Sequence, residues 1–370
     1  MGIGRRKEAR RFVRSEVNMR YGRFLSPGGT IGFVAPSFGS AMQPYRAAFE
    51  NSLDRFHDMG YNTLLGPNCY EGCGVGISNK PELCGREFEE YYINDGADVL
   101  ISCGGGELMC EILDHIDFNA VKAAPAKWFM GYSDNTNLTY LLATICDVAS
   151  VYGPCAASFG MEPWHESVKD AFGIITGAQS RVNGYPAWEK ESLKTPDTPL
   201  VPYNTTERTV LAFHPGGPDG MVVFGEDIPE TEFSGRLIGG CMDCLVNLLG
   251  TRYDRTQDFL ARYKDDGFVW FLEACDLNVF AIRRAMWQME HAGWFENVKG
   301  FIIGRPLSGM DGMFNLDRYD AVLYAAASHG VPVVMDADLG HLPPSMPLVT
   351  GSYASVRIER GKLGIEMSMI

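Results

Sequence analysis

Short apolar runs alternate with helical stretches from Thr30 to about residue 150 of this chain. A strand followed by a helix and then by another strand is typical of parallel sheets, whose crossovers need a dozen or more residues. We therefore predict a doubly wound, mostly parallel α/β domain of the flavodoxin or Rossmann type, with ligands beyond the carboxyl ends of its strands. The expected strands are residues 30–36, 61–65, 98–102 and 127–130, and the expected helical stretches are 43–59, 81–94 and 107–116.

The whole chain is predicted to have four parts. Residues 1–23 form a basic N-terminal arm, and residues 24–161 form the first α/β domain. Residues 162–208 contain five prolines and little sustained periodicity, so they are interpreted as a connecting segment. Residues 209–370 again alternate apolar runs with helical stretches, which predicts a second α/β domain with a mixed sheet.

Composition narrows the class of protein. With 370 residues and 46% hydrophobic side chains, the chain is typical of a globular enzyme, and its formal charge of −14 argues against a nucleic-acid partner. It has no run of about eighteen apolar residues, so no membrane span is expected. The N-terminus lacks the apolar core of a secretory signal, and ten dispersed cysteines are typical of reduced thiols, so we expect a cytoplasmic protein. The Cys241–Cys244 pair is the one C-x-x-C, and any redox role for it is left open.

One serine stands where an apolar run turns into a helix. Ser133 follows the run Trp128–Gly131 and precedes an expected amphipathic helix. This is half of the G-x-S-x-G elbow of hydrolases, because Asn135 replaces the second glycine. Ser133 is therefore either a helix N-cap or a nucleophile whose oxyanion would meet the free N–H groups of the helix.

A nucleophilic serine needs a base and an acid, and two residues at the ends of apolar runs are candidates. His341 follows the run Val331–Gly340 in a proline-rich loop, and Glu273 ends the apolar run Gly267–Leu272. Each has an ordinary alternative, a loop histidine bound to backbone or an exposed acid at a turn. His214 is the next candidate base. The chain order of serine, acid and histidine is the order found in α/β hydrolases.

A series of short motifs, taken together, resembles the LD-carboxypeptidase family, which also contains the microcin C self-immunity peptidases. The resemblance covers about residues 24–365. The motifs are Pro27–Ser37, Cys103-Gly-Gly105, Gly131-Tyr-Ser-Asp134, Tyr152-Gly-Pro154, Gly235–Gly240, Leu272-Glu273 and Gly340-His341.

The resemblance implies a role for each matching residue. Ser133 is expected to be the nucleophile, His341 the general base and Glu273 the acid that orients it. Backbone N–H groups of Asp134 and Gly105 are expected to form the oxyanion hole. The family also implies a homodimer. A mechanism that uses these three residues needs no metal or organic cofactor.

Substrate contacts are expected at Gly104 and at Trp188, because the segment around Trp188 resembles the insertion of the immunity branch, where an aromatic ring can stack on a base. The chain departs from common family forms at three positions, with Cys241 where Asn is usual, and Ala274 and Arg283 where Asp is usual. These departures leave the three proposed catalytic residues intact but affect their surroundings.

Three functions follow as hypotheses. The favoured one is an immunity-like serine peptidase or amidase that hydrolyses the amide bond of peptidyl- or aminoacyl-nucleotide compounds. The second is an LD-carboxypeptidase that removes terminal D-Ala from a murein tetrapeptide. The third is a non-catalytic two-domain protein that binds a small ligand. All three expect a small peptide or nucleotide-like partner and neither nucleic acid nor membrane.

Overall fold

The computed structural model describes residues 18–72 and 76–369, so most of the predicted basic arm lies outside the described residues. The strands are β1 Thr30–Val34, β2 Asn62–Leu65, β3 Val99–Ser102, β4 Trp128–Gly131, β5 Ser150–Tyr152, β6 Arg181–Asn183, β7 Ala187–Glu189, β8 Thr205–Arg208, β9 Ala212–His214, β10 Val223–Phe224, β11 Thr231–Cys241, β12 Phe268–Glu273, β13 Val298–Gly304, β14 Val333–Ala337, β15 Leu348–Thr350, β16 Tyr353–Glu359 and β17 Lys362–Ser368. The α-helices are α1 Tyr45–Asp58, α2 Pro81–Ile93, α3 Phe118–Ala123, α4 Thr136–Thr144, α5 Glu166–Thr176, α6 Met242–Leu248, α7 Thr256–Arg262, α8 Val279–His291 and α9 Arg318–Ala326.

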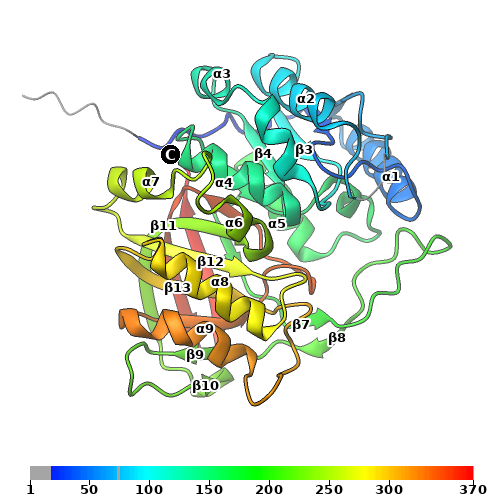
Figure 1. Cartoon of the computed structure of the whole chain (residues 1–370). Helices are drawn as coiled ribbons and strands as arrows, with labels where there is room; N and C mark the ends of the chain where they lie inside the picture. Colours follow the sequence, from blue (N-terminus) through cyan, green and yellow to red (C-terminus); the bar gives the residue numbers. More distant parts are fainter. Residues whose placement is uncertain (1–17, 73–75, 370) are drawn as a thin grey trace, which may run out of the picture.

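The first sheet has the strand order β15-β5-β4-β3-β1-β2, and β1 to β5 run parallel (Figure 1). Apart from β15, this is the flavodoxin order, and the predicted fold class is confirmed. The order reverses direction at β1, since β2 lies on one side of it and β3 on the other. Such a switch point opens a crevice beyond the carboxyl ends of the two central strands.

Helices cover both faces of the first sheet. Right-handed crossovers from β1 to β2 and from β2 to β3 run in opposite directions, which places α1 and α2 on opposite faces. Accordingly, α1 packs against the short 3₁₀ helix Ala156–Gly160, whereas α2 packs against α3 and the 3₁₀ helix Met109–His115. The helical stretch expected at residues 107–116 is thus a 3₁₀ helix.

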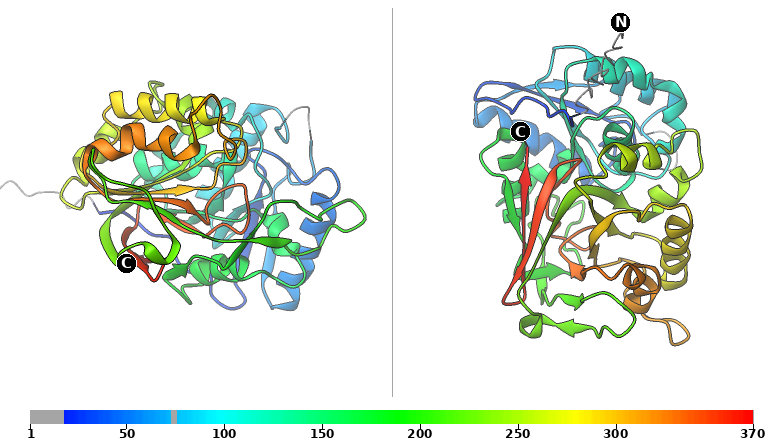
Figure 2. Two further views of the ribbon diagram at one scale, coloured as in Figure 1. Left: turned by 90° about the horizontal axis from the view of Figure 1, so that it is seen from below. Right: turned by 90° about the vertical axis from the view of Figure 1, so that its left-hand side faces the viewer.

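The second sheet is mixed, as predicted. Strands β11 to β14 are parallel neighbours, and antiparallel strands extend the sheet at both sides in the order β10-β9-β14-β13-β12-β11-β16-β17-β6. Helices α8 and α9 pack against each other along one face of this sheet (Figure 2). The parallel strands are buried along almost their whole length, which explains their nearly continuous apolar sequences.

Each sheet contains a strand from a distant part of the chain. β15 pairs antiparallel with β5 and so completes the first sheet from the C-terminal part of the sequence. β6, within the predicted connecting segment, pairs with β17 at the edge of the second sheet. The predicted domain boundaries therefore do not coincide with the ends of the two sheets.

The connecting segment contains more regular structure than its sequence suggests. Helix α5 buries Val168, Ala171, Ile174 and Ile175, and the His165 side chain accepts a hydrogen bond from the Ser167 N–H at its start. Strands β7 and β8 form a separate hairpin. Prolines flank these elements rather than interrupt them. Among the described residues, no helix is both long enough and apolar enough to cross a bilayer.

Candidate active site

Three side chains from three strand ends form a continuous hydrogen-bond chain. Ser133 follows β4, Glu273 ends β12, and His341 lies in the loop after β14. The Ser133 hydroxyl is 2.8 Å from Nε2 of His341, and Nδ1 of His341 is 2.8 Å from Oε2 of Glu273. The carboxyl ends of the parallel strands in the two sheets therefore meet, and this is the juxtaposition that the sequence predicts.

The backbone at Ser133 is a sharp strand-to-helix turn. Its φ is +64°, a left-handed conformation that costs a residue with a side chain roughly 1 kcal/mol. Asn135, in the place of the second glycine of the elbow, donates from Nδ2 to the carbonyls of Tyr132 and Gly104 at 3.0 and 2.8 Å. Asn135 thus holds the turn by side-chain hydrogen bonds, and Ser133 is not an ordinary helix N-cap.

Helix α4 anchors the turn. All nine of its residues are buried, because the helix lies between the first sheet and β11, α6 and α7. Tyr140 stacks on Trp294 with ring centroids 5.6 Å apart, and its hydroxyl bonds to Thr256 at 2.7 Å. The helix is therefore buried on all sides rather than amphipathic, since packing between two layers removes its solvent-facing side.

Burial and charge set the electrostatics of the pair formed by His341 and Glu273. Burial acts to raise the pKa of the Glu273 carboxyl, but the neighbouring His341 outweighs it, so the pKa is lowered. Burial acts to lower the pKa of His341, but the charge of Glu273 outweighs it and raises that pKa. The arrangement therefore stabilises an imidazolium, which forms when a histidine removes a serine proton.

Three further residues contact the hydrogen-bonded series Ser133, His341 and Glu273. The sequence alone predicts no catalytic role for them. Tyr152 donates its hydroxyl to Oε1 of Glu273 at 2.5 Å and accepts the Ser133 N–H at 3.2 Å. The thiol of Cys241 contacts the Glu273 carboxylate, and that of Cys275 contacts His341. Tyr152 belongs to the motif Tyr152-Gly-Pro154, and its place in that motif is the sequence feature that could have indicated a role in the site.

The glycine loop after β3 lies directly against the serine. A side-chain carbon added at Gly105 would stand 3.2 Å from the Ser133 hydroxyl oxygen, so only glycine leaves space there. The Asp134 side chain is 4% exposed and accepts hydrogen bonds from Ser37 Oγ at 2.5 Å and from the Met109 N–H at 2.8 Å. The backbone of Gly105 therefore lies beside Ser133, and an oxyanion hole formed by Gly105 and Asp134 stays a prediction.

A cavity of about 310 Å³ opens on the His341 side of Ser133. The loop between β7 and β8, which extends from the hairpin toward α1 in Figure 1, forms one wall of it. The lining includes three tyrosines, two charged residues and the predicted glycines, namely Tyr45, Tyr132, Tyr203, Glu189, Lys194, Gly104 and Gly105. Gly104 lines this cavity, and its contact with a substrate stays a prediction.

Trp188 does not line this cavity. Its ring faces Arg305, whose guanidinium carbon is 5.0 Å from the ring centroid, and it borders a separate cavity of about 180 Å³. Successive residues of a strand point to opposite sides, so it is the next residue, Glu189, that faces the His341 cavity. In this conformation Trp188 is not positioned to stack on a group bound beside Ser133.

His214, the other candidate base, lies on β9 and accepts a hydrogen bond from the Gly216 N–H at 3.0 Å. Ligand atoms of Cys241, Glu273 and His341 lie within 4.8 Å of one another, a donor set that a metal ion could use. Glu273 and His341, however, already bond to each other, and His341 also bonds to Ser133. No disulfide joins two cysteines of the described part of the chain.

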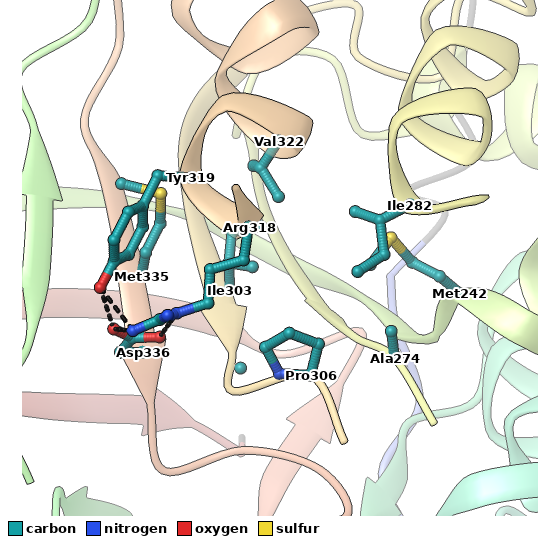
Figure 3. A pocket seen from close by; sticks show the side chains of 11 residues that line it. Met242, Ala274, Ile282, Ile303, Pro306, Arg318, Tyr319, Val322, Met335 and Asp336 are labelled. Atoms are coloured by element: carbon teal, nitrogen blue, oxygen red, sulfur yellow. Dashed lines mark hydrogen bonds and ion pairs between the residues drawn. The ribbon is translucent and has the colours of Figure 1, made fainter. Parts of the chain in front are cut away.

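A small apolar gap, about 10 Å³ in volume, is lined by none of the residues Ser133, Glu273 and His341 (Figure 3). Met242, Ile282 and Val322 point into it from α6, α8 and α9, and Arg318 bonds to Asp336 beside it. Its size and apolar walls identify it as a packing defect between the helices and the second sheet.

A buried ion pair fixes the loop that carries His341. Asp338 bonds to Arg305, and the two residues are 1% and 2% exposed. The Asp338 carboxylate also accepts the Tyr185 N–H at 2.6 Å and the Thr209 hydroxyl at 3.1 Å. The loop that carries His341 is therefore hydrogen-bonded to the residues before and after the β7–β8 hairpin.

Replacing Asp338 with alanine is expected to lower the free energy of unfolding by about 3 kcal/mol, because Arg305 would keep a buried charge without its partner. Urea denaturation would measure this change. The exposed pair of Glu232 and Arg357 provides the control, since Glu232→Ala should leave the free energy of unfolding nearly unchanged. Equal losses in the two variants would contradict the structural role of the buried pair.

Comparison with known proteins agrees with this architecture. Residues 31–153 match the N-terminal domain and residues 234–356 the C-terminal domain of the LD-carboxypeptidase family. The microcin C7 self-immunity protein MccF of Escherichia coli is 22% identical over 350 residues, which cover 92% of this chain and 94% of that protein.

Two solved structures show the same fold. The MccF-like protein from Bacillus anthracis superposes with a TM-score of 0.76 at 19% identity, and the match covers 94% of this chain and 99% of that one. MccF in complex with aspartyl sulfamoyl adenosine gives a TM-score of 0.74 at 19% identity with the same coverage. By its two matching domain models, the chain belongs to the LD-carboxypeptidase family of serine carboxypeptidase-like hydrolases.

Proposed function

We propose that this protein is a serine amidase in which Ser133, His341 and Glu273 form the catalytic triad. The observation that carries the proposal is the hydrogen-bond chain from the Ser133 hydroxyl through both nitrogens of His341 to Glu273, which begins at a left-handed turn. A strained elbow and an oriented imidazole together are what nucleophilic serine catalysis needs.

In this mechanism His341 Nε2 takes the Ser133 proton while the Ser133 oxygen attacks the amide carbonyl. The Glu273 carboxylate stabilises the imidazolium, and the N–H groups of Asp134 and Gly105 hold the negative oxygen of the tetrahedral intermediate. His341 then returns the proton to the leaving amine, and an acyl-enzyme remains on Ser133. Water activated by His341 hydrolyses this ester and restores the serine.

The proposed substrates are aminoacyl or peptidyl groups joined to a nucleotide by an amide. The leaving group must reach His341, and the cavity on that side is large and lined by Tyr45, Tyr132 and Tyr203. Aromatic rings of this kind can stack on a base. The relatives support the assignment, since MccF structures hold glutamyl sulfamoyl guanosine and aspartyl sulfamoyl adenosine.

One observation favours the second candidate, an LD-carboxypeptidase. Lys194 lines the same cavity. Burial lowers the pKa of its ammonium group, and the charge of Glu189 offsets only part of this effect. A lysine there suits the free carboxylate of a terminal D-amino acid.

The two candidates are separated by offering the purified protein an aminoacyl sulfamoyl adenosine and a murein tetrapeptide side by side. The expected result is release of the free amino acid from the adenosine compound. Chromatography and mass spectrometry would detect the released amino acid. Cleavage of the tetrapeptide alone would replace the first candidate by the second. Binding of either compound without turnover would instead support a non-catalytic ligand-binding protein.

A further inference from the structure

A second, smaller pocket lies on the other side of Ser133 from the tyrosine-lined cavity. Its volume is about 70 Å³, which leaves room for about two water-sized groups. We call it the acyl-side pocket, and define it by Ser133, Asn137 and the four acidic residues Glu107, Asp134, Asp243 and Asp276.

The position of this pocket indicates which part of a substrate enters it. His341 must donate a proton to the leaving group, so the leaving group lies in the cavity that His341 lines. The acyl part stays bonded to Ser133 and extends in the opposite direction. This assignment rests on the proposed function.

The acyl-side pocket is strongly negative. Four carboxylates border it, and no lysine or arginine does so in the described part of the chain. The carboxylates of Asp134 and Asp243 are held by hydrogen bonds, Asp243 accepting the N–H groups of Cys275 and Asp276 at 3.0 and 2.9 Å. Glu107 and Asp276 are exposed, and neither forms an ion pair within residues 18–72 and 76–369.

Two independent features point to a hydrogen-bond donor in this space. Partial burial and the charges of Asp276, Asp134 and Asp243 raise the pKa of Glu107, so the pocket already repels negative charge. Asn137 is 1% exposed and donates from Nδ2 to the Asp134 backbone and side chain, which turns its Oδ1 away from them. That oxygen has no hydrogen-bond partner among the described residues.

We propose that the acyl-side pocket binds a protonated amine of the substrate's acyl residue, and that the enzyme prefers cationic over acidic acyl groups. The amine is either the α-amine or a side-chain amine such as that of lysine. The chemistry is the same in both cases. The ammonium group lies among carboxylates and donates its N–H groups to the acceptor oxygens that have no other partner. An aspartyl or glutamyl side chain would meet like charges there and be rejected.

The test uses aminoacyl sulfamoyl adenosines that share one leaving group and differ only in the acyl residue. Lysyl, norleucyl and glutamyl compounds are compared, each with a free and an acetylated α-amine. We expect kcat/KM to fall at least about tenfold when the recognised ammonium is removed, with the glutamyl compound the poorest. The lysyl and norleucyl pair reports on a side-chain amine, and the acetylated set reports on the α-amine.

Charge variants assign the effect to the pocket. Glu107→Gln and Asp276→Asn should each reduce the preference for the cationic compound, and Asp276→Lys should shift it toward the glutamyl compound. Both positions are exposed, so folding should be retained. Glu111 is an exposed acid on the 3₁₀ helix Met109–His115, which follows Glu107, and it does not line the pocket. Glu111→Gln should therefore leave the preference unchanged.

The outcomes separate this inference from the proposed function. Equal kcat/KM for all acyl groups, or a preference for glutamyl, would overturn the inference while the amidase activity stands. If no compound is hydrolysed, the proposed function fails, and calorimetric binding of the same compounds to Ser133→Ala still decides whether the pocket selects an ammonium. A preference for the glutamyl compound that disappears after treatment with EDTA would identify a divalent cation as the occupant of the pocket and would also overturn the inference.

Discussion

Replacing Ser133 with alanine is expected to lower kcat for the amide substrate by at least about 10⁴-fold. The substitution removes the oxygen that attacks the carbonyl, and no other hydroxyl accompanies His341 Nε2 among the hydrogen bonds of the site. The measurement is the rate of amino acid release from an aminoacyl sulfamoyl adenosine at saturating substrate.

The control for this variant is a measurement of its stability and of its affinity for the substrate. Alanine at φ +64° keeps the unfavourable turn, whereas Ser133→Gly removes it, so the glycine variant should be more stable by roughly 1 kcal/mol and equally inactive. Both variants should still bind the substrate. Retention of more than a few per cent of the activity in either variant would exclude Ser133 as the nucleophile.

Replacing Glu273 with glutamine is expected to lower kcat by about 10³- to 10⁴-fold and to move the acid limb of the pH profile to lower pH. Activity needs neutral His341 and is lost as the pH falls through the pKa of that residue. The Glu273 charge raises this pKa, so its removal lowers the pKa and displaces the limb in the same direction. The measurement is kcat/KM against pH for the two proteins.

Tyr152→Phe is the matched comparison for Glu273→Gln. It removes a hydrogen bond to the other oxygen of Glu273 but keeps the negative charge and the bond to His341 Nδ1. The loss of rate should therefore be smaller, and the acid limb should stay close to that of the unaltered protein. A shift to higher pH in Glu273→Gln would contradict the assigned role of the carboxylate.

Long-range features of this fold were hardest to predict from the sequence. Alternating apolar and helical segments were enough to predict the fold class, because strands and helices of ordinary length leave clear periodicity. β15 and β6 are three residues each, too short for a periodic pattern, and their pairing depends on partners far along the chain. Helix α5 has 11 residues and was missed for another reason, because the prolines on either side of it are typical of an irregular segment.

The site shows a similar division. Residues at strand ends could be proposed as partners because parallel strands bring their carboxyl ends to one edge. Their hydrogen bonds, and the role of Tyr152, depend on how the two sheets pack, which no local pattern describes. Trp188 and Glu189 illustrate the point at single-residue scale, since a shift of one position along β7 decides which side chain faces the cavity.

The pairing of β15 with β5 also affects how the chain is made. During synthesis, β1 to β5 leave the ribosome long before residues Leu348–Thr350, so the first sheet must wait with the edge of β5 unpaired. An open strand edge is a template for pairing with other chains. Truncated products that end before β15 should therefore aggregate, and the nascent protein should depend on chaperones until its last segments have been translated.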